Sequence, residues 1–162
     1  MTYISYISLI FLLITKFTLA ETITRMANLS IHAQIISSCH TVGNLVEPLD
    51  FGLHYFINLN QIKSNGALRI ICTPDIHYQI LLGSGQSGYS MQRYLTNNIT
   101  GEKIKYNLYT DAQYKIIWDD IKGLTLVSNG KENSIPIYGL ILAQNTPLFG
   151  KYTDIIRITI QW

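Results

Sequence analysis

Two cysteines, Cys39 and Cys72, are the residues of this chain best suited to covalent or metal chemistry. They can form a disulfide, bind a metal ion or act as reactive thiols. Structural zinc sites usually combine CxxC pairs with histidines at a short spacing. Neither cysteine belongs to a CxxC, and His40 follows Cys39 directly, so in a strand its side chain points to the opposite face. The spacing therefore favours a disulfide, provided that the protein reaches an oxidising compartment.

Residues 1–20 predict that the protein does reach such a compartment. An almost continuous apolar run, Ile4 to Ile14, precedes small residues just before Glu21, which is typical of a cleaved signal peptide. The run is about half as long as a membrane-spanning helix. An uncleaved anchor is the alternative, because no Lys or Arg precedes the run and Lys16 follows it. After export, a Cys39–Cys72 disulfide would stabilise the fold by roughly 3–4 kcal/mol on the chain-entropy model.

Other residues that could support chemistry are better explained by turns and loops. Gly83–Gly88 reads G-x-G-x-x-G, but this fingerprint binds dinucleotides only between a strand and a helix, and no helical period follows it. Asp119 and Asp120 could form the carboxylate pair of a glycoside hydrolase, yet adjacent residues in a strand point in opposite directions. No metal-ligand spacing relates the histidines His32, His40, His54 and His77. We therefore expect no catalytic residue, no cofactor and no metal, and predict that the protein is not an enzyme.

The composition predicts a single all-β domain. The 162 residues suffice for one core, and with 48% hydrophobic and 14% charged residues the chain is unlike a disordered one. A net charge of +2 is too small to indicate nucleic-acid binding. Short alternating segments separated by turn residues indicate a β-sandwich. We expect strands at 68–72, 77–82, 103–109, 114–118, 124–127, 135–142 and 152–162, with a mobile loop over 83–94.

The two ends of the exported chain carry complementary strand patterns. In the last segment, Ile156, Ile158 and Ile160 share one face, and the chain stops without a further strand to pair with it. From Met26 to Ile35 the chain also alternates, and its apolar face consists of Ala27, Leu29, Ile31, Ala33 and Ile35. An exposed apolar edge is normally shortened, charged or covered. The N-terminal strand therefore either folds back onto its own domain or is given to another molecule.

Several short motifs make residues 39–162 resemble the spore coat U family, which includes subunits of archaic (Csu-type) chaperone–usher pili. The motifs are Cys39-His40-Thr41-Val42, Leu49-Asp50-Phe51-Gly52, Ile70-Ile71-Cys72-Thr73, Tyr106-Asn107-Leu108-Tyr109-Thr110-Asp111-Ala112 followed by Trp118, Pro136-Ile137-Tyr138-Gly139 and Gly150-Lys151-Tyr152-Thr153-Asp154. The stretch Arg93-Tyr94-Leu95 matches the family only approximately.

The resemblance implies an incomplete immunoglobulin-like sandwich that lacks its final strand and is completed by donor-strand exchange. It divides the chain into a signal peptide (1–20), a donor-strand segment (21–38) and the sandwich domain (39–162). The donor residues would be those of the 26–35 apolar face, and the acceptor groove would include Ile156, Ile158 and Ile160. The implied partners are a periplasmic chaperone, an outer-membrane usher and neighbouring subunits of a surface pilus that serves attachment and biofilm formation. The alternative is a monomeric exported sandwich that binds carbohydrates or surfaces.

Overall fold

The computed structural model describes residues 23–162, which divide into two units, 23–34 and 35–162. The predicted signal peptide over 1–20 and the expected start of the mature chain at Glu21 lie outside the described residues. In the part of the chain that is described, no helix is long and apolar enough to cross a bilayer.

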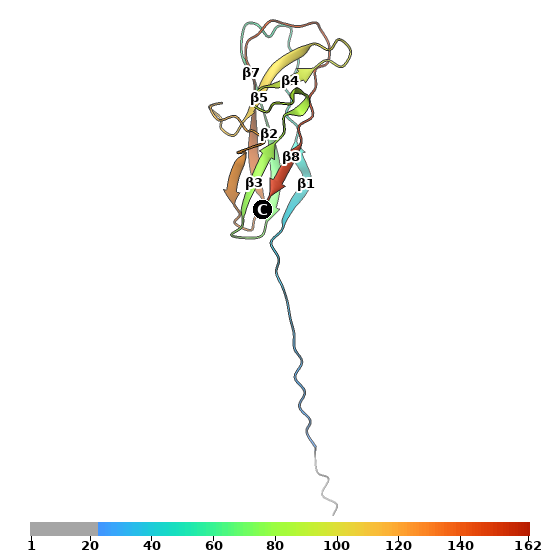
Figure 1. Ribbon diagram of the computed structural model, residues 1–162, viewed down its shortest axis with the longest axis vertical. Helices are drawn as coiled ribbons and strands as arrows, with labels where there is room; N and C mark the ends of the chain where they lie inside the picture. Colours follow the sequence, from blue (N-terminus) through green and yellow to red (C-terminus); the bar gives the residue numbers. More distant parts are fainter. Residues whose placement is uncertain (1–22) are drawn as a thin grey trace, which may run out of the picture. The chain divides into compact units, whose positions relative to one another are not determined.

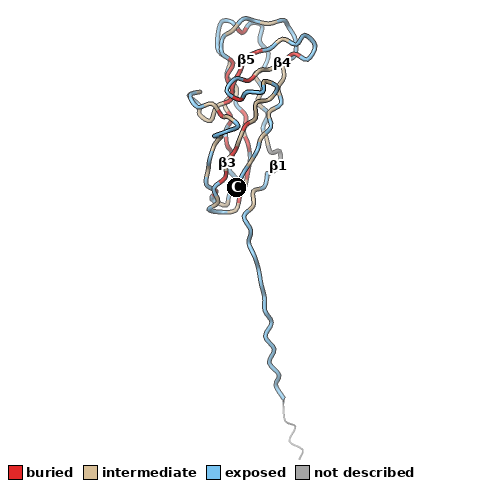
Figure 2. The backbone as a smooth tube through the Cα atoms, in the orientation of Figure 1, coloured by how far each residue is buried: buried red, intermediate tan, exposed pale blue. Residues whose placement is uncertain are grey.

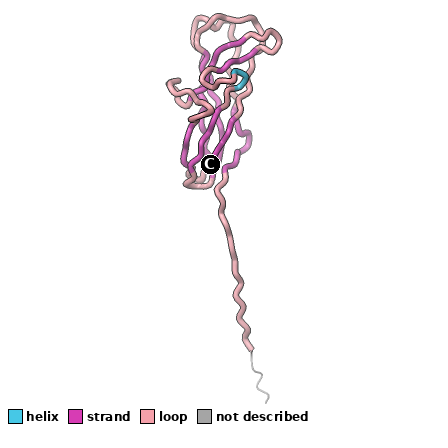
Figure 3. The backbone as a smooth tube through the Cα atoms, in the orientation of Figure 1, coloured by secondary structure: helices cyan, strands magenta, loops and turns pink. Residues whose placement is uncertain are grey.

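Residues 23–38 form neither a helix nor a strand (Figure 3). The strand predicted over 26–35 is thus not formed in the isolated chain, because a strand requires a hydrogen-bonded neighbour and this segment belongs to no sheet. The larger apolar side chains of the segment are exposed, with exposed fractions of 84% for Leu29, 85% for Ile31 and 89% for Ile35. A run of exposed apolar residues is characteristic of a surface that binds something.

Within residues 35–162 the strands form two antiparallel sheets (Figure 1). The larger sheet has five strands in the order β1-β2-β7-β5-β4, namely Cys39–Glu47, Ile62–Cys72, Asn133–Ile141, Lys103–Tyr109 and Arg93–Thr96. The smaller sheet has three strands in the order β6-β3-β8, namely Leu124–Val127, His77–Leu82 and Ile158–Gln161. A single turn of 3₁₀ helix, η1, covers Gly85–Ser87.

The core lies between the facing sides of the two sheets, where the buried residues gather (Figure 2). Alternate residues of β2 and β3 supply its centre, because successive side chains of a strand point to opposite faces. Leu68 and Ile70 come from β2, and Ile80 and Leu82 from β3, each exposed by 1% or less. The all-β sandwich predicted from the sequence is therefore confirmed.

Most predicted strands are present, but one is absent, and the strand predicted over 152–162 is formed only at Ile158–Gln161. The predictions for 77–82, 103–109 and 124–127 coincide with β3, β5 and β6. The strand predicted over 114–118 is wrong, because this segment is a loop whose one ladder pairing is the isolated Tyr109–Ile117 bridge. Its cause is local: Asp111 accepts hydrogen bonds from the N–H groups of Gln113, Lys115 and Ile116, and Tyr114 has a left-handed φ of 57°.

Two other strands, β1 and β4, were not expected as strands. A register shift between Thr41 and Val46 interrupts β1, and Gly43 in this bulge has a φ of +58°. The bulge hides the period of two on which a strand prediction relies. The strand β4 is only four residues long and begins at the end of the segment that was expected to be a loop.

Two of the sequence motifs meet in the larger sheet. Leu49 and Phe51 lie against Gly139 of β7 so closely that an added Cβ would come within 2.7 Å of Leu49 Cδ1 and 3.0 Å of Phe51 Cζ. Phe51 also makes an edge contact with Tyr106, at 6.0 Å between ring centroids. A side chain at 139 would therefore displace Leu49 from its contact with the sheet.

Trp118 connects the loop after β5 to the smaller sheet and provides a test of the core. It is fully buried, and its indole N–H donates to Ile80 O at 2.8 Å. We expect Trp118→Phe to lower the free energy of unfolding by about 1–3 kcal/mol, because the indole hydrogen bond to Ile80 O and part of the core packing are lost. Urea unfolding followed by circular dichroism measures this. The control Tyr55→Phe, at a side chain that is 94% exposed, should change stability by less than about 0.5 kcal/mol; equal effects would contradict the assignment.

Candidate functional site

The last strand, β8, forms an edge of the smaller sheet although its side chains belong to the core. Among the strands of residues 23–162 it pairs with β3 alone, with Ile158 opposite Leu82 and Ile160 opposite Ile80. The β3 partners are fully buried, whereas Ile156, Ile158 and Ile160 pack against the core but stay half-buried. The polar alternates Arg157, Thr159 and Gln161 are exposed. The inner face of β8 therefore exposes apolar surface that a further strand could cover.

The backbone of β8 has unpaired groups on the same side. Gly83 N donates to Arg157 O at 2.8 Å, which makes this pair a hydrogen-bonded one. In an antiparallel ladder such pairs alternate with pairs whose N–H and C=O groups point away. The N–H and C=O groups of Ile158 and Ile160 therefore point away from β3, toward an edge where no described strand is paired. Ile158 and Ile160 thus combine half-buried apolar side chains with backbone N–H and C=O groups that are available to a further strand.

In the larger sheet, β1 is also an edge strand, because β2 is its one partner in the described part of the chain. Its first residue, Cys39, is paired with Cys72 at the end of β2, and Gln161 of β8 is paired with Gln79 near the start of β3. Residues 73–76 connect β2 to β3, so both edges reach the same end of the sandwich.

Hydrogen bonds from the rest of the domain position the chain that leads into β8. Thr153 bridges to Thr96 of β4 through two backbone bonds of 2.9 and 3.0 Å. Asp154 then accepts from Gln86 N at 2.9 Å and from the Tyr106 hydroxyl at 2.8 Å. Burial, followed by the hydrogen bond to Asp154, raises the pKa of Tyr106, so the phenol stays protonated and remains a donor. The C-terminal segment therefore passes from the larger sheet to the smaller one at a fixed point.

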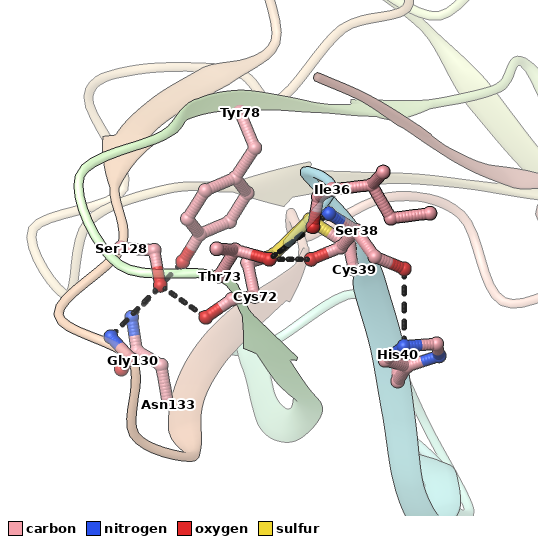
Figure 4. Close-up of a disulfide and its surroundings, with 10 residues drawn as sticks. All are labelled: Ile36, Ser38, Cys39, His40, Cys72, Thr73, Tyr78, Ser128, Gly130 and Asn133. Atoms are coloured by element: carbon pink, nitrogen blue, oxygen red, sulfur yellow. Dashed lines mark hydrogen bonds between the residues drawn. A yellow bond between two sulfur atoms is a disulfide. The ribbon is translucent and has the colours of Figure 1, made fainter. Parts of the chain in front are cut away.

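The disulfide is formed between Cys39 and Cys72, as predicted, and fixes the residues where the sandwich begins (Figure 4). Thr73 reinforces this junction: its N–H donates to Ser38 O at 2.9 Å, and its Oγ1 accepts from Ser38 N at 3.0 Å. Thr73 Oγ1 can also donate to Ile36 O at 3.4 Å. The chain is thus held to β2 from Ser38 onward, immediately after the segment predicted to be a donor strand.

The other residues that could support chemistry have structural roles in the fold. In the G-x-G-x-x-G segment, an added Cβ on Gly85 would lie 2.2 Å from Asp154 Oδ2, so this glycine lets the segment pack against the Asp154 carboxylate. The carboxylates of Asp119 and Asp120 bond to the loop 121–123 and to Ser90 respectively. Between residues 23 and 162 no cluster of His, Cys, Asp and Glu has the arrangement of a metal site.

Arg93 is a residue that the sequence reasoning missed. Although it lies in the four-residue strand β4, its guanidinium reaches the end of β3 and is completely buried. It donates to Gly83 O at 2.9 Å, Leu82 O at 2.7 Å and Trp118 O at 2.8 Å. An arginine beside a glycine-rich segment gives no sequence signal of burial, since arginine is almost always exposed.

A family model for the Spore Coat Protein U domain matches residues 25–159. The chain belongs to this family. The resemblance inferred from the motifs is therefore confirmed, and the matched residues include the N-terminal segment as well as the sandwich.

Solved structures similar to this Spore Coat Protein U domain come from chaperone–usher pili. One is the pre-assembly complex of the chaperone CsuC with the tip adhesion subunit CsuE of Acinetobacter baumannii archaic Csu pili, at a TM-score of 0.54 and 16% identity. That match covers 79% of this protein but 40% of that chain, so this protein spans less than half of its length. Another is a chaperone–usher pilus studied for rod uncoiling, at a TM-score of 0.57 and 14% identity, covering 88% and 99% of the two chains. These neighbours establish an immunoglobulin-like fold. A comparison with curated proteins finds no match.

Removing the disulfide should destabilise the Spore Coat Protein U domain without changing its fold. We expect Cys39→Ala combined with Cys72→Ala to lower the free energy of unfolding by about 3–4 kcal/mol, because the unfolded chain regains the entropy of the opened loop. Urea unfolding gives the value. The reduced wild type serves as the control and should unfold at the same urea concentration as the double variant. A change below about 1 kcal/mol would show that the bond carries little stability.

The loop that follows Trp118 should make stability depend on pH. Burial alone would raise the pKa of Asp119, but backbone N–H donors of Gly123, Ile121 and Lys122 outweigh it and lower the pKa. A carboxylate whose pKa is lower in the folded state stabilises the fold above its unfolded pKa, near about pH 4, and this contribution disappears as the pH falls through the folded value.

We therefore expect the free energy of unfolding to fall below about pH 4, and to fall less steeply in Asp119→Asn. Thermal unfolding between about pH 2.5 and 7 measures both proteins. Asp75→Asn, at an exposed turn position, is the control and should follow the wild type. Identical profiles for the wild type and Asp119→Asn would contradict this role of the carboxylate.

Proposed function

We propose that the protein is a structural subunit of a chaperone–usher type pilus, which accepts a strand from another molecule along β8 and donates its own N-terminal segment to a neighbour. The observation that carries this proposal is the state of β8: its inward side chains belong to the core yet are half-buried, and their backbone groups face an unpaired edge. A strand added at such an edge forms main-chain hydrogen bonds along its length and covers alternate side chains.

Residues 26–35 have the chemistry that this edge requires. Their apolar face is Ala27, Leu29, Ile31, Ala33 and Ile35. Burial of each of the larger side chains contributes roughly 1.5–3 kcal/mol, and the two alanines contribute less. In an antiparallel ladder, directly opposed residues share one face of the sheet, so apolar donor residues would stand opposite Ile156, Ile158 and Ile160. Donor and acceptor thus have the same period of two.

The comparisons support the same role. The CsuC–CsuE structure is a chaperone bound to a pilus subunit before assembly, and the second neighbour is an assembled chaperone–usher pilus. By analogy, the partners of this protein are a periplasmic chaperone, an outer-membrane usher and neighbouring subunits in a homo- or hetero-polymer. The protein is then exported through the periplasm to a surface pilus, where it serves attachment and biofilm formation without enzymatic activity.

A pair of substitutions on opposite faces of the donor segment tests the proposal. Ile31→Asp places a charge where an apolar side chain must be buried, so we expect assembly of the full chain to weaken by at least about tenfold to a hundredfold. His32→Asp introduces the same charge at the next residue, on the polar face, and should assemble like the wild type. Size-exclusion chromatography of the purified chains, followed over time, measures the polymer fraction.

Two outcomes would contradict the donor role. Equal polymer growth of the Ile31→Asp and His32→Asp chains would show that the apolar face of the segment is not buried in the polymer. A wild-type chain that stays monomeric and unfolds reversibly would favour the alternative, an exported sandwich that binds carbohydrates or surfaces as a monomer.

A further inference from the structure

The buried guanidinium of Arg93 lies at the point where the ladder between β3 and β8 ends. Gly83 N donates to Arg157 O at 2.8 Å, which continues the β3–β8 ladder one residue beyond β3. Gly83 O accepts from Arg93 Nε at 2.9 Å. In an undisturbed antiparallel pair, two opposed residues exchange both of their hydrogen bonds. Arg93 therefore binds the carbonyl that would otherwise return a bond to the strand leading into β8.

On the side of β3 that faces β6, Arg93 supplies a hydrogen bond that a neighbouring strand would otherwise supply. The strand β6 ends its pairing with β3 at Leu124 opposite Ile80, so Leu82 has no β6 residue beside it. Leu82 O instead accepts from Arg93 Nη2 at 2.7 Å, and Leu82 N donates to Asp119 O at 3.1 Å. One guanidinium thus satisfies consecutive carbonyls that point to opposite sides of β3.

The geometry of Arg93 is fixed from the larger sheet. Its Nη1 donates to Asn107 Oδ1 at 2.6 Å, and Asn107 Nδ2 donates to Met91 O at 2.6 Å. Its acceptors are carbonyl and amide oxygens of the chain rather than a carboxylate. The planar guanidinium therefore acts through the fixed directions of its N–H donors and not through an ion pair. Lysine has a single nitrogen on a flexible stem and cannot reproduce these directions.

From this geometry we infer that Arg93 is a positioning residue for strand acceptance: it fixes the end of β3, and through it the register and order of β8, before a donor strand binds. The inference rests on the proposed function, because it concerns the edge that accepts the donor. A site that is ordered before binding does not have to order its backbone during association. Arg93 should therefore act on the rate of donor binding as well as on stability.

The experiment uses the full chain carrying Ile31→Asp, which weakens its own donor segment and keeps it monomeric, and a synthetic peptide with the unchanged sequence of residues 23–38 as the donor probe; every chain compared below carries Ile31→Asp. We compare the wild type with Arg93→Lys, Arg93→Gln and the control Leu126→Ala, which removes core contacts from β6 on the opposite edge of the same sheet. We expect both Arg93 variants to bind the peptide about tenfold or more slowly, with Arg93→Gln at least as slow as Arg93→Lys. The Leu126→Ala chain should lose stability but associate at the wild-type rate.

Amide hydrogen exchange supplies a readout that a purely stabilising role would not change. The Gly83 amide faces β8, whereas the Tyr78 amide faces β6. In the Arg93 variants we expect the exchange of Gly83 to rise about tenfold relative to that of Tyr78, whereas Leu126→Ala should not raise this ratio.

The outcomes separate this inference from the proposed function. If the peptide does not bind the wild type, the strand-acceptor function itself fails. If it binds the wild type and Arg93→Lys at the same rate, only the role of Arg93 is overturned. Should neither Arg93 variant fold, the wild type still decides the question: a Gly83 amide that exchanges without protection in the donor-free monomer would overturn the inference, and a protected one would support it.

Discussion

The rest of the structure depends on one constraint, which is that every backbone N–H and C=O group of a strand needs a partner. In the smaller sheet β3 meets this requirement on one side of β8, and no strand within residues 23–162 meets it on the other. Because Ile158 and Ile160 also face the core, the same edge lacks both hydrogen bonds and apolar cover. An ordinary edge strand exposes only its backbone, and water satisfies those groups. Here water would also have to wet the margin of the core, which is unfavourable.

The network around the C-terminal segment makes this edge a defined surface. The Thr96–Thr153 bridge, the Asp154 carboxylate and the Arg93 guanidinium fix where the segment leaves the larger sheet and where its pairing with β3 begins. At the other end of the sandwich, the disulfide and the Thr73–Ser38 bonds fix where β1 begins. In the proposed function, these attachments keep the acceptor edge ordered and let the donated residues start immediately before Ser38.

The sequence predicted those parts of the molecule in which local pattern and tertiary environment agree. The alternation in β3 and β5 reflects one buried face, and the two cysteines, which have no metal-ligand spacing, form the predicted disulfide. The parts that it did not predict are those in which a hydrogen bond from a distant residue decides the conformation. Asp111 turns the chain before Tyr114, and no propensity indicates that the Arg93 side chain is buried between the sheets. For the candidate site, the alternating isoleucines predicted the apolar face of β8. That β8 lies at the edge of its sheet could be established only from the strand order.

Among the sheet edges of residues 35–162, the edge of β8 differs from the others in what it offers to a further strand. The outer edge of β4 is partly occupied by Thr153, and β6 is only four residues long, so neither offers an extended template. In β1, the bulge around Gly43 interrupts the regular spacing of backbone groups. The edge of β8 combines free backbone groups with apolar side chains at a period of two. A strand that pairs there must present apolar residues at alternate positions, because a shift by one residue would turn its polar face toward the core. In the proposed function, selectivity for the donor therefore comes from register rather than from any single contact.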